Sequence, residues 1–158
     1  STLDRSSAAS DVYKRQVLGN LIDFEGIDVL DLFAGTGSIS YEFASRGAAS
    51  VTSVEINAVH YDFIRSTARA YLLDAIHAVK ANVFLYLKNS SKRYDVIFSD
   101  APYDLEGSER VVDMVLGREM LKEDGIFVFE HSKDKSFAGH PRLYDVRNYG
   151  SVHFSIFR

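Results

Sequence analysis

Apolar and polar positions follow two regular patterns along this chain. Five short apolar runs have the length and composition of buried strands: residues 27–33, 50–55, 76–80, 94–99 and 125–130. The segments between them have helical periodicity, and we expect helices at residues 38–46, 58–73 (with Asn57 as the N-cap), 83–87 and 108–120. Because strands and helices alternate with short links, the pattern predicts a parallel sheet with helices on both faces.

The two ends of the chain depart from this alternation. Residues 142–147 and 152–157 alternate strictly between apolar and polar side chains around residues 148–151, which predicts a β-hairpin. The expected fold class is therefore α/β, a doubly wound and mostly parallel sheet that ends in an antiparallel hairpin. Residues 1–16 show no convincing periodicity, and we expect this segment to be unanchored and non-native. A single domain is expected over residues 17–158, beginning with the remnant of a helix.

The composition excludes several classes of protein. With 158 residues and 46% apolar side chains, the chain can bury a core. It has no cysteine, which excludes disulfides, thiolate metal sites and cysteine nucleophiles and fits a cytoplasmic location. No apolar run approaches the ~18 residues that span a bilayer, so we expect no membrane partner. We also expect no metal, and the composition does not indicate an oligomeric state.

The charge is distributed unevenly. The net charge of -4 argues against tight, non-specific binding to nucleic acid, because contacts to phosphates need cations. Residues 131–158, however, contain five Lys or Arg against two Asp, which leaves +3 there and -7 on the rest of the chain. This basic end could dock on a structured RNA or a ribonucleoprotein, or it could be an ordinary solvated edge.

A glycine turn follows the first predicted strand, where open α/β sheets bind ligands. Gly35 and Gly37 allow the backbone to approach a ligand closely. The dinucleotide fingerprint would need a glycine at Ser40, and the lysine of a phosphate-binding P-loop is missing. Asp31 would repel a pyrophosphate but suits a cationic sulfonium amino acid; alternatively, it only stabilises the turn.

Two further polar residues follow the next strands. Glu55 ends the second strand, where a carboxylate can accept hydrogen bonds from both ribose hydroxyls. Asn82, with the next backbone N–H, could read an adenine edge, cap the following helix, or do both. This order of elements predicts S-adenosylmethionine as the cofactor. We assign its site to Asp31, Phe33, Ala34, Gly35, Gly37, Glu55, Asn82 and Val83.

The turn after the fourth strand, Asp100-Ala101-Pro102-Tyr103, suits chemistry on an exocyclic amine. Such an amine is a poor nucleophile, and hydrogen-bond acceptors aimed at its hydrogens stabilise the charge that develops during attack. Asp100 and the Ala101 carbonyl offer those acceptors, and Pro102 stiffens the turn. Tyr103 offers a stacking face worth roughly 1–3 kcal/mol per base. The alternative is a simple turn, which Asp and Pro favour anyway.

Two stretches resemble a known family. Residues 29–38 (Val-Leu-Asp-Leu-Phe-Ala-Gly-Thr-Gly-Ser) and 99–103 (Ser-Asp-Ala-Pro-Tyr) are similar to motifs of class I S-adenosylmethionine-dependent methyltransferases. More narrowly, the chain resembles, over roughly residues 18–157, the bacterial family that methylates the exocyclic N2 of one guanine in 16S ribosomal RNA. The resemblance implies a Rossmann-like fold. It implies cofactor roles for Asp31, Gly35, Gly37 and Glu55, and target-base roles for Asp100, Pro102 and Tyr103.

The chain departs from that family at two places. Ala101 replaces the first proline of the tetrapeptide, and residues 1–16 do not match the family's basic Arg-Pro-Thr opening. We expect an enzyme that acts on ribosomal RNA within an assembled small ribosomal subunit, because the acidic body favours a folded ribonucleoprotein over bare RNA. Two alternatives stay open: a non-catalytic cofactor- or RNA-binding module, and an amino-methyltransferase acting on adenine or a protein glutamine.

Overall fold

A seven-stranded sheet forms the centre of the protein in this computed structural model, which describes residues 8–102 and 104–158. The strands are β1 (Asp28–Leu32), β2 (Ser50–Val54), β3 (Ile76–Val79), β4 (Tyr94–Asp100), β5 (Leu121–Ser132), β6 (Leu143–Tyr149) and β7 (Val152–Phe157). Their order is β3-β2-β1-β4-β5-β7-β6. The first five strands along the chain are parallel, and β7 is antiparallel to both β5 and β6. The predicted fold class, a mostly parallel sheet ending in an antiparallel hairpin, is confirmed.

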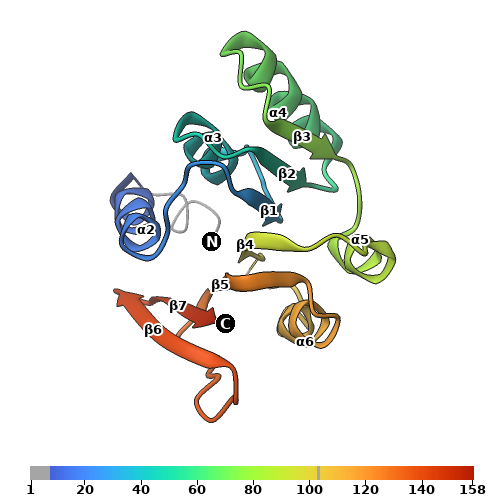
Figure 1. Cartoon of the computed structure of the whole chain (residues 1–158). Helices are drawn as coiled ribbons and strands as arrows, with labels where there is room; N and C mark the ends of the chain where they lie inside the picture. The colour runs from blue at the N-terminus through green and yellow to red at the C-terminus, as the bar shows by residue number, and fades with distance from the viewer. Residues whose placement is uncertain (1–7, 103) are drawn as a thin grey trace.

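Helices cover both faces of this sheet (Figure 1). They are α2 (Ala8–Leu21), α3 (Ser38–Ser45), α4 (Ala58–Ala70), α5 (Val83–Asn89) and α6 (Arg110–Gly117). Figure 1 shows α2 and α3 on one face, α5 and α6 on the other, and α4 near the edge formed by β3. Among the helices of the described part of the chain, none is long and apolar enough to cross a membrane.

The beginning of the chain differs from its expectation. The segment up to Gln16 was expected to be unanchored, and this is wrong from Ala8 onward, because α2 spans Ala8–Leu21. Lys14 is 4% exposed and Leu18 is fully buried. The buried face of α2 includes a charged residue, so the helix lacks the apolar periodicity by which helices are recognised. Residues 1–7 lie outside the described residues, and the non-native origin of residues 1–16 stays a prediction.

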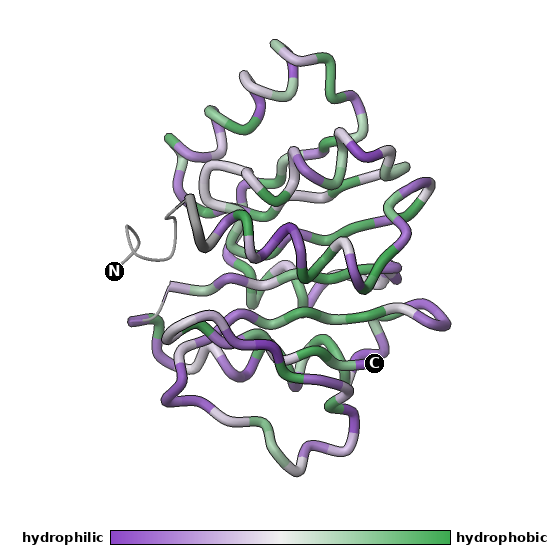
Figure 2. Tube along the Cα trace, turned by 90° about the vertical axis from the view of Figure 1, so that its left-hand side faces the viewer, coloured by the Kyte–Doolittle hydropathy of each residue, from purple (hydrophilic) through white to green (hydrophobic). Residues whose placement is uncertain are grey.

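Buried side chains form one hydrophobic layer on each face of the sheet. Leu30 and Phe127 belong to the layer that packs against α5 and α6, whereas Val29 and Val128 belong to the layer under α2 and α3. Neighbouring positions in a strand contribute to opposite layers because successive side chains point to opposite faces. Figure 2 shows this hydrophobic content along the central strands. Both faces of β1, β4 and β5 are therefore covered, which leaves their ends as the accessible parts.

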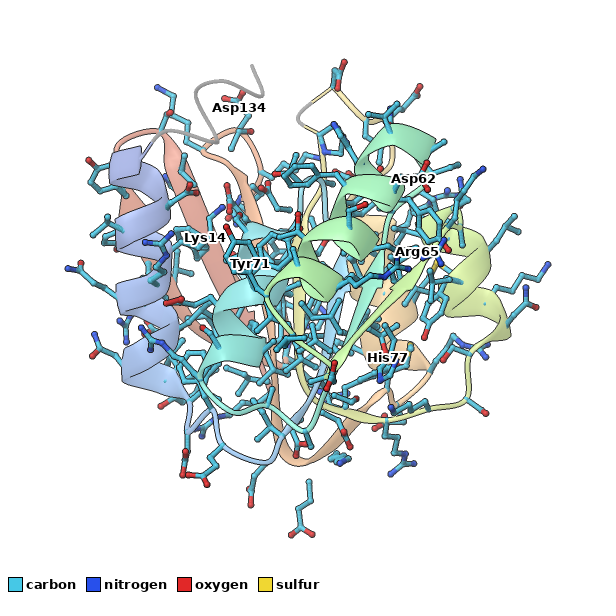
Figure 3. The ribbon with its side chains drawn as sticks, turned by 90° about the horizontal axis from the view of Figure 1, so that it is seen from above. Lys14, Asp62, Arg65, Tyr71, His77 and Asp134 are labelled. Atoms are coloured by element: carbon cyan, nitrogen blue, oxygen red, sulfur yellow. The ribbon has the colours of Figure 1, made fainter. Side chains whose placement is uncertain are left out.

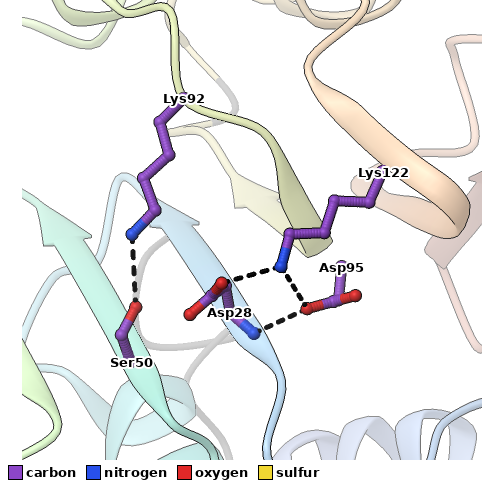
Figure 4. A network of polar contacts seen from close by, with 5 residues as sticks. All are labelled: Asp28, Ser50, Lys92, Asp95 and Lys122. Carbon is purple, nitrogen blue, oxygen red and sulfur yellow. Dashed lines mark hydrogen bonds and ion pairs between the residues drawn. The ribbon is translucent and has the colours of Figure 1, made fainter.

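A polar network joins three strands where they begin (Figure 4). The Lys122 Nζ lies 2.8 Å from Asp28 Oδ2 and 3.2 Å from Asp95 Oδ2, and the Asp28 N–H donates to Asp95 Oδ2 at 2.8 Å. The hydrogen bond from Lys122 is the main cause of the lowered pKa of Asp28. Lys122 is 40% exposed, so solvent screens these pairs and their contribution to stability is small. The network aligns the beginnings of β1, β4 and β5 and so helps to place their carboxyl ends.

Gly37 is the position in the glycine turn that tolerates a side chain least. Its φ is 90°, and a Cβ atom built there would lie 2.7 Å from the ring carbon Cζ and the hydroxyl oxygen of Tyr41. That hydroxyl is held by the Thr36 carbonyl oxygen at 2.6 Å. We expect Gly37→Ala to lower the free energy of unfolding by about 2–3 kcal/mol, since both backbone strain and displacement of Tyr41 oppose it. Urea denaturation of the two proteins measures this difference.

Gly35→Ala is the matched control for this prediction. Gly35 has a φ of 59°, but no atom lies within 4 Å of a Cβ built there. The control is therefore expected to show only the backbone cost, about 1–2 kcal/mol. Equal losses for the two variants would mean that Tyr41 moves away freely.

Candidate functional site

The site lies where the sheet reverses its strand order. β1 and β4 are adjacent and parallel, with Leu32 opposite Ser99, so the turn after β1 and the turn after β4 emerge at the same edge. A cavity of about 640 Å³ opens there. Eight of the predicted site residues line it: Phe33, Ala34, Gly35, Glu55, Asn82, Val83, Asp100 and Pro102.

The other four predicted residues are placed differently. Asp31, Gly37 and Ala101 are absent from the residues that line the cavity. Asp31 is 2% exposed and Ala101 is 4% exposed, so both lie behind the cavity wall. Tyr103 lies outside the described residues, and its stacking role stays a prediction.

Glu55 holds the glycine turn in place. Its Oε1 accepts a hydrogen bond from the Gly35 N–H and its Oε2 accepts one from the Asn57 N–H, both at 2.8 Å. A carboxylate has about four acceptor positions. Each oxygen of Glu55 therefore keeps a lone pair that a hydroxyl group can use. The turn also depends on Phe33, a non-glycine residue with a φ of 57°, which the motif did not reveal.

Asp31 belongs to a buried network beneath the turn. The Ser40 hydroxyl donates to Asp31 Oδ2 at 2.6 Å, and the hydroxyl oxygens of Ser40 and Ser53 are also 2.6 Å apart. Burial raises the pKa of Asp31 to about 7, although the hydrogen bond from Ser40 and the charge of Lys14 oppose the rise. Ser40, which broke the dinucleotide fingerprint, thus stabilises the carboxyl group. This placement favours the turn-stabilising alternative, and a direct cofactor contact from Asp31 stays a prediction.

Asp31→Asn is expected to make stability less dependent on pH between about pH 4 and pH 7. A carboxyl group whose pKa is higher in the folded protein than in the unfolded chain binds its proton more tightly when folded. Its contribution is therefore favourable at low pH and is lost as the pH rises through the folded pKa. The variant keeps an oxygen that accepts from Ser40 but has no proton to lose. We expect the wild type to lose a few kcal/mol more than the variant over this range.

Urea unfolding of both proteins at several pH values measures this effect. All other titratable groups are present in both proteins, so the difference between them reports on Asp31 together with the charges that interact with it, Lys14, Asp100 and Glu55. Parallel stability profiles would show that Asp31 stays ionised in its buried position.

Asn82 caps the helix that borders the cavity. Its Oδ1 accepts from the N–H groups of Phe84 at 2.9 Å and Leu85 at 3.2 Å, which confirms the predicted cap at the start of α5. The Phe84 ring also lines the cavity and lies edge-on to Phe33, with 6.5 Å between ring centres. The adenine-reading role of Asn82 and Val83 stays a prediction.

The end of β4 brings Asp100 beside two charged groups. Asp100 pairs in register with Glu130 on β5. The Lys14 Nζ from α2 lies 3.7 Å from Asp100 Oδ2 and 3.0 Å from Glu130 Oε1, and Figure 3 shows this side chain pointing from α2 toward the sheet. Burial acts to lower the pKa of Lys14, but the carboxylates of Asp100 and Glu130 outweigh burial and raise it. The pocket therefore places a buried cation next to the carboxylate that is predicted to accept a hydrogen bond from the target amine.

Sequence reasoning missed several residues of the cavity wall. Lys14 and Asp11 line it from α2, and Leu105 lines it from the segment after β4. Lys14 lay in a stretch without periodicity, so no pattern marked it, and the position of Leu105 depends on an irregular segment. Within residues 8–102 and 104–158, no group of His, Cys, Asp or Glu side chains could hold a metal ion.

The topology and the pocket together define a class: a Rossmann-like domain of the kind found in methyltransferases. The Escherichia coli protein yhhF has this fold, with a TM-score of 0.84 and 18% identity over 96% of this chain and 86% of that one. The ribosomal protein L11 methylase of Lactobacillus delbrueckii subsp. bulgaricus matches with a TM-score of 0.73 and 16% identity, over 94% of this chain and 78% of that one. At these identities the likeness is one of fold.

The sequence comparison identifies a more specific group than the fold comparison does. The family described as conserved hypothetical protein 95 matches residues 10–158, and the chain belongs to this family. A relative from Buchnera aphidicola subsp. Baizongia pistaciae, named ribosomal RNA small subunit methyltransferase D, is 30% identical over 121 residues, which cover 75% of this chain and 62% of the relative. The chain thus spans about three fifths of that relative's length. The family resemblance drawn from the two motifs is confirmed.

Proposed function

We propose that this protein transfers a methyl group from S-adenosylmethionine to the exocyclic N2 of a guanine in 16S ribosomal RNA. The observation that carries the proposal is the shared cavity: Asp100 and the turn held by Glu55 line the same space. The name of the Buchnera relative supports ribosomal RNA as the substrate class.

The cavity fits the cofactor in size and chemistry. Its volume, about 640 Å³, lies in the range of small-molecule sites. Glu55 would accept the ribose hydroxyls, Asn82 and Val83 would border the adenine, and the backbone of Phe33 to Gly35 would face the amino-acid end. No atom lies within 4 Å of a Cβ built on Gly35, so the turn leaves open space for a ligand. When bound, the cofactor supplies a methyl group on a positively charged sulfur.

The last residue of β4 and the residues that follow it would prepare the target amine. Asp100 accepts a hydrogen bond from the amine, which favours a more tetrahedral nitrogen and stabilises the positive charge that develops there. Pro102 also lines the cavity and restricts the turn that holds Asp100. A second acceptor at the Ala101 carbonyl stays a prediction, because Ala101 is not among the residues that line the cavity. Tyr103 is proposed to stack on the base. The remaining rate enhancement comes from holding the nitrogen in line with the methyl group.

Ion pairs within the basic end of the chain favour a folded ribonucleoprotein as the substrate. Three cations of this end are paired with acids of the chain: Lys135 with Glu109, Arg142 with Glu119, and Arg147 with Asp145. Cations that are already paired contribute less to binding of a phosphate backbone. Shape recognition of an assembled small subunit therefore fits better than electrostatic binding of bare RNA.

Methyl transfer to defined substrates tests the proposal. Tritiated S-adenosylmethionine is supplied with unmethylated small subunits, with free 16S RNA, or with subunit proteins alone, and the modified residue is mapped. The expected result is label on the N2 of one guanine, with assembled subunits as the preferred substrate. Label on adenine or on a protein glutamine would support the other amino-methyltransferase reading. Cofactor binding without transfer to any substrate would support the non-catalytic module.

A further inference from the structure

Part of the cavity wall lies between β4 and α6, where the described residues, 101–102 and 104–109, belong to no helix or strand. Pro102 and Leu105 line the cavity, and the Leu105 N–H donates to the Pro102 carbonyl oxygen at 3.0 Å. The Arg110 N–H donates to the Gly107 carbonyl oxygen, also at 3.0 Å. We call Pro102 and residues 104–109 the wall segment. These backbone bonds shape the wall segment and join its far end to the start of α6.

Lys135 attaches the far end of the wall segment to the sheet. Its Nζ donates to Ser108 Oγ at 2.6 Å and to Glu109 Oε2 at 2.9 Å. Ser108 is only 4% exposed, so this contact is sheltered from water. The Lys135 N–H bonds the carbonyl oxygen of Ser132, the last residue of β5, at 3.3 Å. The wall segment is therefore tied to the carboxyl end of β5. Glu130, near that end, pairs in register with Asp100.

Glu109 is used for this attachment and not for capping. It occupies the N-cap position of α6 but makes no side-chain cap hydrogen bond. Its carboxylate instead contacts Lys135, and that hydrogen bond is the main cause of the lowered pKa of Glu109. The next residue, Arg110, places its guanidinium carbon 4.7 Å from the centre of the Phe84 ring, which also lines the cavity. Successive residues thus fasten the start of α6 to β5 on one side and to α5 on the other.

We propose that Lys135 is a positioning residue: its bonds to Ser108 and Glu109 fix the wall segment and thereby set where the target base lies relative to Asp100. This rests on the proposed function, since it assigns the wall segment to the base side of the cavity. Glu109 is 54% exposed, so the ion pair contributes little to global stability. Its effect is geometric, because methyl transfer is sensitive to small displacements of the reacting atoms.

Lys135→Met tests the proposal, with Lys133→Met as the matched control. Methionine keeps the length of the side chain but removes its charge and its donors. Lys133 is exposed in the same loop, and within the described residues its side chain makes no ion pair or hydrogen bond. The first measurement is amide hydrogen exchange of residues 104–109 in the whole chain without RNA. Lys135→Met is expected to speed this exchange by about tenfold. Lys133→Met is expected to leave it unchanged.

Kinetics then separate positioning from binding. We expect Lys135→Met to lower kcat by about tenfold, while the cofactor Kd changes by less than about twofold. Equal losses in the Lys133 and Lys135 variants would overturn the proposal, because they would reflect general attraction of RNA to this loop. Unchanged exchange and unchanged kcat in Lys135→Met would overturn it as well.

A charge exchange provides the rescue. Lys135→Glu and Glu109→Lys should each loosen the wall segment, and the double variant should recover protection and turnover, since the pair is restored with reversed charge. If both single variants lost protection and turnover but the double variant recovered neither, the ion pair between residues 109 and 135 would not be the cause, and the proposal would be overturned. If the wild type transfers no methyl group, the proposed function fails, whereas hydrogen exchange still shows whether Lys135 fastens the wall segment.

Discussion

Asp100→Asn is expected to lower kcat for methyl transfer by about 100- to 1000-fold while leaving cofactor affinity nearly unchanged. Asparagine has nearly the same volume but no charge, so the folded turn survives while the stabilisation of the charge on the amine is lost. The side chain of Asp100 is 21% exposed at the edge of the cavity, consistent with contact to a substrate and not with a core role. Single-turnover transfer from labelled cofactor and calorimetric titration of the cofactor measure the two quantities.

Asp74→Asn serves as the control for Asp100. Asp74 is an exposed carboxylate in the turn before β3 and is not among the residues that line the cavity. Its loss changes the net charge by the same amount, so any general electrostatic effect on RNA binding appears in both variants. If Asp100→Asn weakened cofactor binding as much as turnover, Asp100 would be a structural residue of the turn.

Glu55→Ala is expected to weaken cofactor binding by about 10- to 100-fold, which corresponds to about 1.5–3 kcal/mol for hydrogen bonds to a charged acceptor. Removing the carboxylate deletes the proposed ribose contacts. It also frees the N–H groups of Gly35 and Asn57, which loosens the turn and the start of α4. Calorimetry with S-adenosylmethionine measures the change.

A 2′-deoxy analogue of the cofactor separates the direct contact from the structural one. The analogue should bind the wild type less tightly than the natural cofactor, and this difference should shrink in Glu55→Ala. Asp62→Ala, on the outer surface of α4 and labelled in Figure 3, is the control and is expected to bind both ligands as the wild type does. An unchanged dissociation constant in Glu55→Ala would remove Glu55 from the cofactor site.

The strand and helix pattern predicted most of the fold because the sheet is buried on both faces. The centre of β4, Val96-Ile97-Phe98, is apolar throughout, since each side chain packs against a helix layer on one face or the other. The boundaries of irregular parts were less accurate. The helix expected over residues 108–120 is shorter (Arg110–Gly117), because β5 already begins at Leu121 to pair with Tyr94.

The site was predictable where a local rule requires a particular residue type. A strand that runs directly into a glycine turn, and an asparagine that precedes a helix, are such cases, and Gly35 and Asn82 lie where these rules place them. Lys14 and Lys135 obey no such rule. Each contacts acidic groups that are distant along the chain, and only the folded structure brings them together.

By itself, the sequence of this protein determined the order of its strands and helices and the two turns that carry candidate chemistry, because backbone propensity and burial act over a few neighbouring residues. The tertiary structure alone decided that those turns share one cavity. It also decided that Asp31 lies beneath that cavity in a buried network, that Lys14 reaches Asp100 and that Lys135 reaches Glu109. These outcomes depend on strand order and on packing between distant segments. Both are decided when the whole chain buries its apolar surface, not by neighbouring residues alone.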